Sequence, residues 1–295
     1  MTNDKKGIAI TLLCYIIWGV LPAYWNILTG VNSLFILCCR IIFAFVFMIG
    51  VIIATGRLKT FRETLRNKTA MRLLIPASVV ISFNWGLYVW AVNNGHILDC
   101  SLGYYINPLI AFLLAVLLFR EKYTKLHLAA VALAFTGVLI SLIAFGSFPV
   151  IAVCIGLSFA AYGALKKKVN VDPAVSIAIE SMLIAPVALV VSLVFLKDSL
   201  LTVSFTDSLL LIGGGALTAI PLILYARAVN TVSFIIVAFF QYVSPSISMI
   251  YGLLTGETLS ASQIISFTFI GLGLIVFSFA LIRKQKQSDM EMKEV

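Results

Sequence analysis

One stretch of this sequence, from Tyr88 to Gly137, occurs twice, and its second copy runs from Tyr225 to Gly273. The matching residues keep a constant offset apart from a one-residue slip. They are Tyr88, Ala91, Val92, Asn93, Tyr105, Pro108, Glu121 and Gly137, which match Tyr225, Ala228, Val229, Asn230, Tyr242, Pro245, Glu257 and Gly273. Internal repeats of this size are a common construction of membrane carriers. We therefore expect two halves that share one plan.

The composition excludes a soluble domain. The chain has 295 residues, of which 61% are hydrophobic and 11% charged, and its mean hydropathy is +1.09. Soluble domains carry about 25% charged residues, so one soluble core cannot hide this much apolar surface. The sequence predicts an all-α integral membrane protein.

A membrane-spanning helix needs about 20 mostly apolar residues, and ten runs meet that length, five in each half. They lie near 7–28, 33–55, 73–93, 101–119, 126–145, 148–165, 173–196, 208–228, 233–255 and 263–282. The first run lacks a short apolar core and a small-residue cleavage site, so we interpret it as a retained helix. We assign residues 1–146 to the first repeat, 147–285 to the second and 286–295 to a cytoplasmic tail.

The basic residues predict the orientation. With the N-terminus inside, 19 of the 21 Lys and Arg residues fall in cytoplasmic segments or helix ends, as the positive-inside rule requires. The net charge of +9 therefore reports orientation, and no nucleic-acid partner is needed to explain it. Both termini are expected in the cytoplasm. With five helices per half, the second repeat enters the membrane from the opposite side, so the repeats are inverted.

Two charges lie inside predicted helices. Arg40 is roughly 10 Å inside the second span at 1.5 Å per residue, and the equivalent position of the seventh span holds Glu180. Inverted symmetry brings both toward the midplane, where they can pair. Such charges either form a packing pair or snorkel, or else they handle a solute charge or a proton. The sequence leaves these interpretations open.

Prolines and aromatic residues mark further candidates. Helix breaks are expected at Pro22, Pro108, Pro221 and Pro245, since proline removes a helical hydrogen bond, and broken helices in matched positions point to a carrier's binding site. Trp18-Gly19 matches Tyr162-Gly163 as an aromatic-Gly pair. The Gly213–Gly215 run is expected to permit close helix packing.

Three polar features have two readings each. The basic segment 56–72 is either a short helix on the inner leaflet or a solvated loop. His96 and Asp99 lie in the outer link before the fourth span, and we interpret them as surface residues rather than as catalytic or pH-sensing ones. Glu121 and Glu257 are boundary or gate charges at helix ends.

Familiar chemistry is missing from the sequence. No Walker A motif is present, and the two histidines give no metal-ligand spacing, so no cofactor and no metal are expected. No nucleophile elbow stands out. ATP-driven pumping and familiar hydrolysis are not expected.

Several segments together resemble the RarD-type branch of the EamA-domain proteins in the drug/metabolite transporter superfamily, along nearly the whole chain. They are Trp18–Trp25, Asn84-Trp85, Ala91–Asn93, Ser101–Pro108, Tyr162-Gly163, Glu180 and Gln241-Tyr242 with Pro245. The resemblance implies ten helices in two inverted EamA repeats, a central cavity, and secondary export or exchange of small organic solutes such as amino acids, other metabolites or amphipathic drugs. One departure is Cys39 before Arg40, where relatives are expected to carry His.

The leading hypothesis is a plasma-membrane secondary transporter that works by alternating access, as a monomer or homodimer in the lipid bilayer, with protons as a candidate coupling ion. Arg40 is expected to anchor an anionic group, and Glu180 to be its counter-charge and proton carrier. The expected cavity lining is Trp18, Trp85, Tyr88, Tyr105, Asn107, Gln241 and Tyr242. The alternatives are a non-transporting sensor or assembly subunit and a lipid-modifying membrane enzyme.

Overall fold

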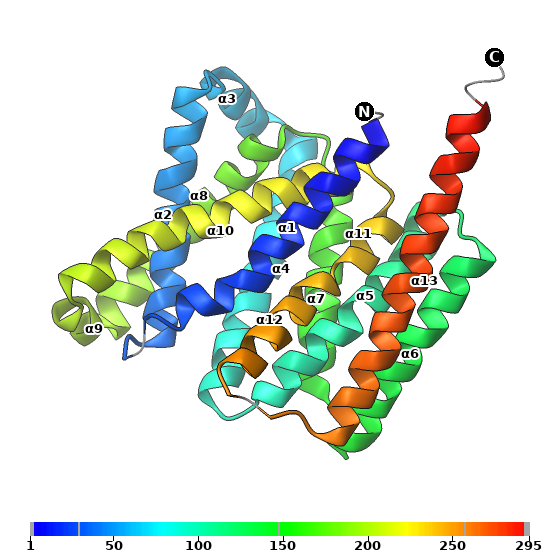
Figure 1. The fold of residues 1–295 in the computed structure, drawn as a ribbon. Coiled ribbons are helices and arrows are strands. Elements are labelled where there is room, and N and C mark those ends of the chain that lie inside the picture. The colour runs from blue at the N-terminus through cyan, green and yellow to red at the C-terminus, as the bar shows by residue number, and fades with distance from the viewer. Residues whose placement is uncertain (1–2, 29, 147, 257, 292–295) are drawn as a thin grey trace.

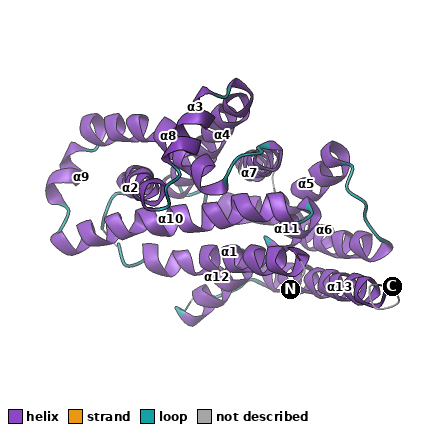
Figure 2. Ribbon diagram, turned by 90° about the horizontal axis from the view of Figure 1, so that it is seen from above, coloured by secondary structure: helices purple, strands orange, loops and turns teal. Residues whose placement is uncertain are grey.

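The computed structural model describes residues 3–28, 30–146, 148–256 and 258–291. Helices and their connections make up this part of the chain, without a strand (Figures 1 and 2). Within it, ten helices are long and apolar enough to cross a membrane. The ten predicted spans are thus confirmed.

The helices follow the predicted runs closely. In chain order they are α1 (Asn3–Trp25), α2 (Ser33–Ala54), α3 (Leu58–Arg66), α4 (Lys68–Asn93), α5 (Ile97–Phe119), α6 (Lys125–Phe145), α7 (Val150–Lys168), α8 (Pro173–Phe195), α9 (Lys197–Thr202), α10 (Phe205–Thr231), α11 (Phe234–Phe240), α12 (Val243–Leu254) and α13 (Ala261–Glu291). The short α3 and α9 are connectors, and α11 and α12 together form one span. α13 continues through most of the predicted tail.

Helix starts are set by side-chain caps in equivalent places of the two halves. The Asn32 carboxamide oxygen accepts hydrogen bonds from the Leu34 and Phe35 amides at the start of α2. The Asp172 carboxylate does the same for Ala174 and Val175 at the start of α8. Such caps satisfy amides that have no partner within the helix. The matched caps support the equivalence of α2 and α8.

Helix packing repeats between the halves. α1 packs against α10 and α12, and its counterpart α7 packs against α4 and α5; α2 contacts α8, and α6 lies beside α13 (Figures 1 and 2). A Cβ on Gly19 would meet the Ser244 carbonyl oxygen at 3.0 Å, and a Cβ on Gly156 would meet that of Gly103 at 3.1 Å. Both glycines therefore allow their helix to approach a neighbouring helix closely, and the match of Gly19 with Gly163 stays a prediction.

Proline interrupts one span only among the described residues. The helix is broken at Gln241 and Tyr242, four and three residues before Pro245, because proline has no amide hydrogen to donate to the carbonyl of Gln241 and its ring clashes with that carbonyl. Pro22, Pro108 and Pro221 lie inside continuous helices. The expected breaks at these three positions are wrong, since neighbouring helices hold the chain helical although a hydrogen bond is lost.

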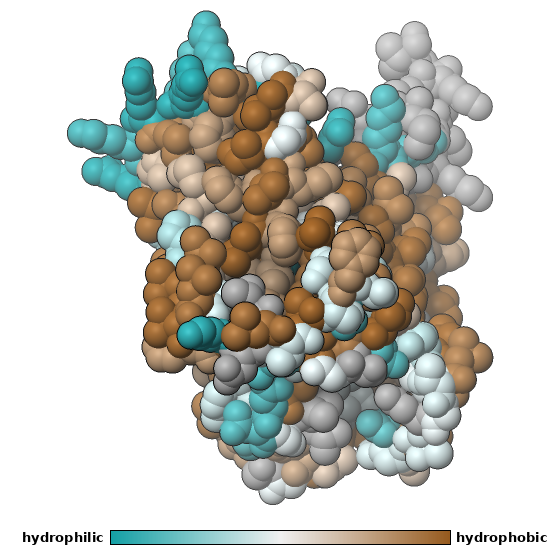
Figure 3. Space-filling model, turned by 90° about the vertical axis from the view of Figure 1, so that its left-hand side faces the viewer, coloured by the Kyte–Doolittle hydropathy of each residue, from teal (hydrophilic) through white to brown (hydrophobic). Residues whose placement is uncertain are grey.

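Both termini and α3 lie at one end of the bundle, which we call the terminal end (Figure 1). Most of segment 56–72 is helical there. Phe61 is on the buried face of α3, and the basic side chains are on its outer face. Between the two ends the surface is broadly apolar (Figure 3), with exposed side chains such as Ile53, Val79 and Phe195. This band matches the hydrocarbon core of a bilayer.

Candidate functional site

Arg40 sits in a cradle of two indole rings, about two turns from the end of α2 that is opposite to the terminal end. Its Cζ atom is 4.5 Å from the centroid of the Trp25 ring and 5.7 Å from that of Trp85. Its Nε donates a hydrogen bond of 3.1 Å to Thr218 Oγ1. Cation–π contacts of this kind stabilise a guanidinium away from bulk water. We call Arg40, Trp25, Trp85 and Thr218 the arginine cradle.

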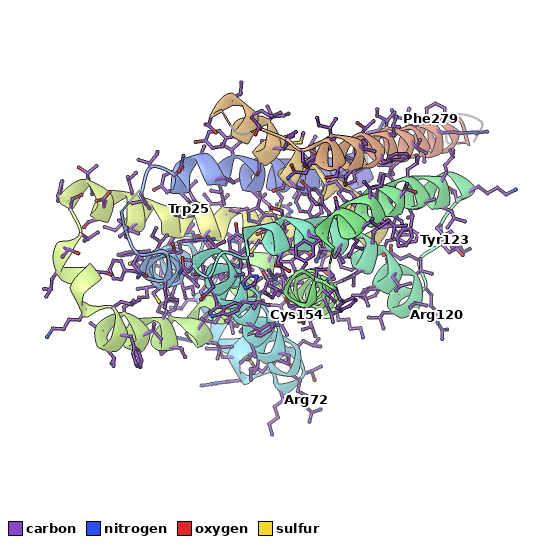
Figure 4. All side chains as sticks on the ribbon, turned by 90° about the horizontal axis from the view of Figure 1, so that it is seen from below. Trp25, Arg72, Arg120, Tyr123, Cys154 and Phe279 are labelled. Carbon is purple, nitrogen blue, oxygen red and sulfur yellow. The ribbon has the colours of Figure 1, made fainter. Side chains whose placement is uncertain are left out.

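The Gly213–Gly215 run allows α10 to approach the arginine cradle. A Cβ on Gly214 would lie 2.9 Å from the Trp25 ring, and one on Gly215 would lie 2.4 Å from the backbone of Phe43 in α2. Figure 4 shows Trp25 beside α10. The expectation of close packing at these glycines is confirmed. Because Gly214 and Gly215 have no side chains, α10 leaves space for the Trp25 indole and for the backbone of α2.

Glu180 lies in a second, buried cluster on the other half of the molecule. Its Oε1 is 2.6 Å from Lys166 Nζ and accepts a hydrogen bond of 3.0 Å from Ser176 Oγ. Its Oε2 accepts a hydrogen bond of 2.9 Å from Tyr162 Oη. Lys166 also donates to Ser176 Oγ. Both carboxylate oxygens are therefore satisfied. We call Glu180, Lys166, Ser176 and Tyr162 the glutamate cluster.

The expected pairing of Arg40 with Glu180 is not what the structure shows. Glu180 has Lys166 as its counter-ion, and within the described residues Arg40 has no carboxylate at ion-pair distance. The physical reason is proximity: Tyr162 and Lys166 are one turn apart on α7, and Ser176 and Glu180 are one turn apart on the neighbouring α8. From the sequence alone, Lys166 is counted only as one of the basic residues at helix ends. The four-residue spacings of Tyr162 with Lys166 and of Ser176 with Glu180 are the signal that could have indicated this cluster.

A small central cavity lies between the arginine cradle and the glutamate cluster. It has a volume of about 20 Å³ and is lined by Trp85 and Thr218 of the arginine cradle, Tyr162 and Glu180 of the glutamate cluster, and apolar residues such as Ile81 and Leu222. Such a volume holds about one water molecule. In this conformation the cavity is too small for an organic solute, so the site is closed.

Among the residues expected to line the cavity, Trp85 does so directly. Trp18 packs on Tyr225, with ring centroids 5.5 Å apart, and Tyr225 stacks on Tyr162 at 6.0 Å. Trp18 is therefore separated from the cavity by Tyr225 and Tyr162, and neither Trp18 nor Tyr88 is in the lining. Tyr88 lies against Tyr104, 5.8 Å away.

The remaining four expected lining residues fix helix packing elsewhere. Asn107 is buried and donates a hydrogen bond to the Gly156 carbonyl of α7. Tyr242 Oη donates to the Tyr105 carbonyl at 3.1 Å. Gln241 is buried at the break between α11 and α12. The central cavity does not have these residues in its lining.

A second ion pair lies at the terminal end, between Glu121 and Lys167, at 3.2 Å. The Glu121 carboxylate also accepts hydrogen bonds from the Phe234 and Ile235 amides at the start of α11. Lys167 Nζ donates to the carbonyl oxygens of residues 229 and 232 at the end of α10. These contacts join both halves, and we call Glu121, Lys167 and the α10–α11 link the terminal latch. Glu257 lies outside the described residues.

His96 and Asp99, the candidates for an interfacial enzyme site, are close together. Their Nδ1 and Oδ2 atoms are 3.2 Å apart, and the imidazole stacks on Trp90. In the described part of the chain, no group of three or more His, Cys, Asp or Glu side chains is arranged to hold a metal ion.

Ten apolar helices around a charged centre define a multi-pass integral membrane protein. Residues 5–143 match the model of the EamA-like transporter family. An uncharacterized transporter of Bacillus subtilis, YojE, is 36% identical over 97% of this chain and 98% of its own. Protein RarD of Escherichia coli is 34% identical over 97% and 98%. A solved crystal structure with 15% identity covers 95% of this chain and 98% of that chain with a TM-score of 0.74, which shows the same fold.

The chain is a RarD-type member of the EamA-like transporter family, and it is therefore a membrane transporter. The matched segment ends close to the boundary predicted for the first repeat.

Proposed function

We propose that this protein is a secondary active transporter that moves small organic solutes across the plasma membrane by alternating access. Its solutes include amphipathic drugs and metabolites, and efflux or exchange is the proposed direction. Protons are the proposed coupling ion, with Glu180 as the group that carries them. Both termini lie in the cytoplasm in this proposal, and the protein works as a monomer or homodimer.

The arginine cradle is the observation that carries the proposal. A charge inside the membrane is expensive and normally serves a pathway for solutes or ions. The Nε atom of Arg40 is bonded to Thr218, whereas its terminal Nη atoms have no hydrogen-bond partner among the described residues. Two donors beside two indole rings suit a flat solute that carries a carboxylate or another anionic group.

The closed cavity and the terminal latch support alternating access. The cavity lies between α2 and α4 of the first half and α7, α8 and α10 of the second. A solute enters only if these helices separate. On the terminal side, separation requires the Glu121–Lys167 ion pair and the bonds of Glu121 to α11 to open. Rocking of one repeat against the other provides both movements.

Uptake in proteoliposomes tests the proposal. Purified protein is reconstituted in inverted orientation and supplied with pooled labelled solutes, including amino acids and flat aromatic acids, with and without an imposed proton gradient. Wild type is compared with Glu180→Gln, and Glu63→Gln, on an exposed part of α3, is the matched control.

Three outcomes distinguish the readings. Gradient-driven accumulation that Glu180→Gln abolishes and Glu63→Gln retains supports proton-coupled transport. Solute exchange that does not depend on the gradient in wild type and both variants supports a carrier and argues against a role of Glu180 in proton transfer. No flux from folded wild-type protein favours the sensor or the membrane-enzyme alternative.

A further inference from the structure

We infer that the central site selects organic monoanions with a flat apolar body and discriminates against zwitterions, such as free amino acids, and against organic cations. This inference rests on the proposed transport function and narrows its solutes. It follows from the unequal state of two charges: Glu180, which lines the cavity, and Arg40, whose neighbours Thr218 and Trp85 line it. Arg40 has hydrogen-bond capacity to spare, and Glu180 does not.

The positive side of the site is available to a ligand. The guanidinium of Arg40 is held by stacking and by one hydrogen bond from Nε. That arrangement leaves its planar outer edge for a carboxylate, which accepts two parallel hydrogen bonds from a guanidinium. Arg40 adjoins the cavity through its neighbours Thr218 and Trp85, which both line it.

The negative side of the site is already occupied by the protein itself. Glu180 is the one carboxylate among the described residues that line the cavity. Its two oxygens accept from Lys166, Ser176 and Tyr162, and Lys166 neutralises its charge. A solute ammonium would have to displace a tethered ammonium or be buried without a partner, and an unpaired buried charge is costly.

The rest of the lining favours a flat apolar body. Ile41, Ile81 and Leu222 supply aliphatic surface, and Trp85 supplies an aromatic face. Once the surrounding helices have separated, an aromatic acid can therefore place its ring against this lining and its carboxylate at Arg40. Lys166 acts as the residue that sets specificity, because its ammonium holds the place that a solute ammonium would need.

Three labelled probes with the same ring test the inference: 3-phenylpropionate, phenylalanine and 2-phenylethylamine. They differ in whether they carry the carboxylate, both charges or the ammonium. Uptake by wild-type proteoliposomes is expected to be at least about tenfold more efficient for 3-phenylpropionate than for the other two, given the strength of charged hydrogen bonds. Arg40→Gln is expected to lose the uptake of 3-phenylpropionate.

Lys166→Gln provides a change of specificity that a merely structural role does not produce. Removing the tethered ammonium leaves Glu180 as a vacant acceptor, so the ratio of phenylalanine to 3-phenylpropionate uptake is expected to rise at least about tenfold. The double variant Lys166→Gln/Glu180→Gln, which leaves no orphaned charge, is expected to show no such rise when the ratio of the two affinities is measured by equilibrium binding to the protein in detergent.

The outcomes separate this inference from the proposed function. Equal uptake of phenylalanine and 3-phenylpropionate by wild type, or a preference for phenylalanine, overturns the inference and leaves transport standing. An unchanged ratio in Lys166→Gln, with the protein monodisperse in detergent, overturns the role of Lys166. No uptake of any probe by folded wild-type protein overturns the inference; the function on which it rests falls with it only if the pooled solutes are not transported either.

Discussion

Lys166 Nζ lies 2.6 Å from Glu180 Oε1, and both side chains are almost completely buried within the second half of the molecule. Ser176 and Tyr162 complete the shell of the carboxylate. An ion pair in such surroundings costs desolvation that its attraction only partly offsets. Its importance is therefore best measured by what happens when one partner is removed.

The first prediction concerns this pair. Lys166→Met and Glu180→Gln each leave a buried group without its counterpart, and loss of one partner of a buried ion pair costs about 3–5 kcal/mol. Lys166→Met/Glu180→Gln is expected to be more stable than Lys166→Met. Thermal unfolding in detergent measures the three variants as a double-mutant cycle. Additive losses in the double variant would contradict the interpretation.

The second prediction concerns the terminal latch. Glu121→Gln removes the charge that pairs with Lys167 and that accepts from two amides of α11. Hydrogen bonds to charged groups contribute about 1.5–3 kcal/mol, so amide hydrogen exchange in α11 is expected to rise about tenfold or more. Glu63→Gln, in the exposed pair with Lys59, should leave it unchanged. Equal exchange in both variants would argue against a latch.

The third prediction concerns the contact between α2 and α10. A Cβ on Gly215 would lie 2.4 Å from the Phe43 backbone, whereas one on Gly86 would meet nothing within 4 Å. Gly215→Ala is expected to destabilise by about 1–3 kcal/mol through overpacking. Gly86→Ala should be neutral or stabilise by up to about 1 kcal/mol, because alanine favours the helix. Detergent unfolding curves compare the two, and similar shifts would refute the close approach.

The fourth prediction concerns the arginine cradle. Arg40→Lys keeps the charge but loses the planar group that stacks on Trp25 and Trp85, so solute affinity is expected to fall about tenfold with little change in stability. The KM for uptake measures it. Arg57→Lys, in an ion pair of 3.5 Å with Asp172 whose side chains are 41% and 32% exposed, is the control. A similar KM for all three proteins would remove Arg40 from the solute site.

The helices were predictable from the sequence because hydrocarbon requires long apolar segments. The caps at Asn32 and Asp172 were equally visible as residue types. The proline breaks were not, because whether a proline ends a helix depends on how its neighbours hold the chain. Pro108 and Pro245 occupy matched positions, yet only the second follows a break.

The site was predictable in its charges and not in their partners. Buried charges stand out in an apolar chain, so Arg40 and Glu180 were found. Symmetry predicts that Arg40 and Glu180 pair with each other. Glu180 of α8 instead pairs with Lys166, which the adjacent helix α7 brings within reach. Tyr105 and Tyr242 were expected to line the cavity, and they pack helices together instead. A tyrosine hydroxyl inside a membrane can bond a neighbouring helix as readily as it can face a cavity.

Two successive lysines near the end of α7 contact different parts of the protein. Lys166 reaches the glutamate cluster, and Lys167 reaches the terminal latch. Neighbouring side chains on an α-helix diverge by about 100°, at 3.6 residues per turn. A rotation of this turn of α7 therefore changes the contact of Lys166 with Glu180 and the contact of Lys167 with Glu121 at the same time. Inserting a single residue between the two lysines would rotate one side chain by about 100° relative to the other, so that both contacts could not form together.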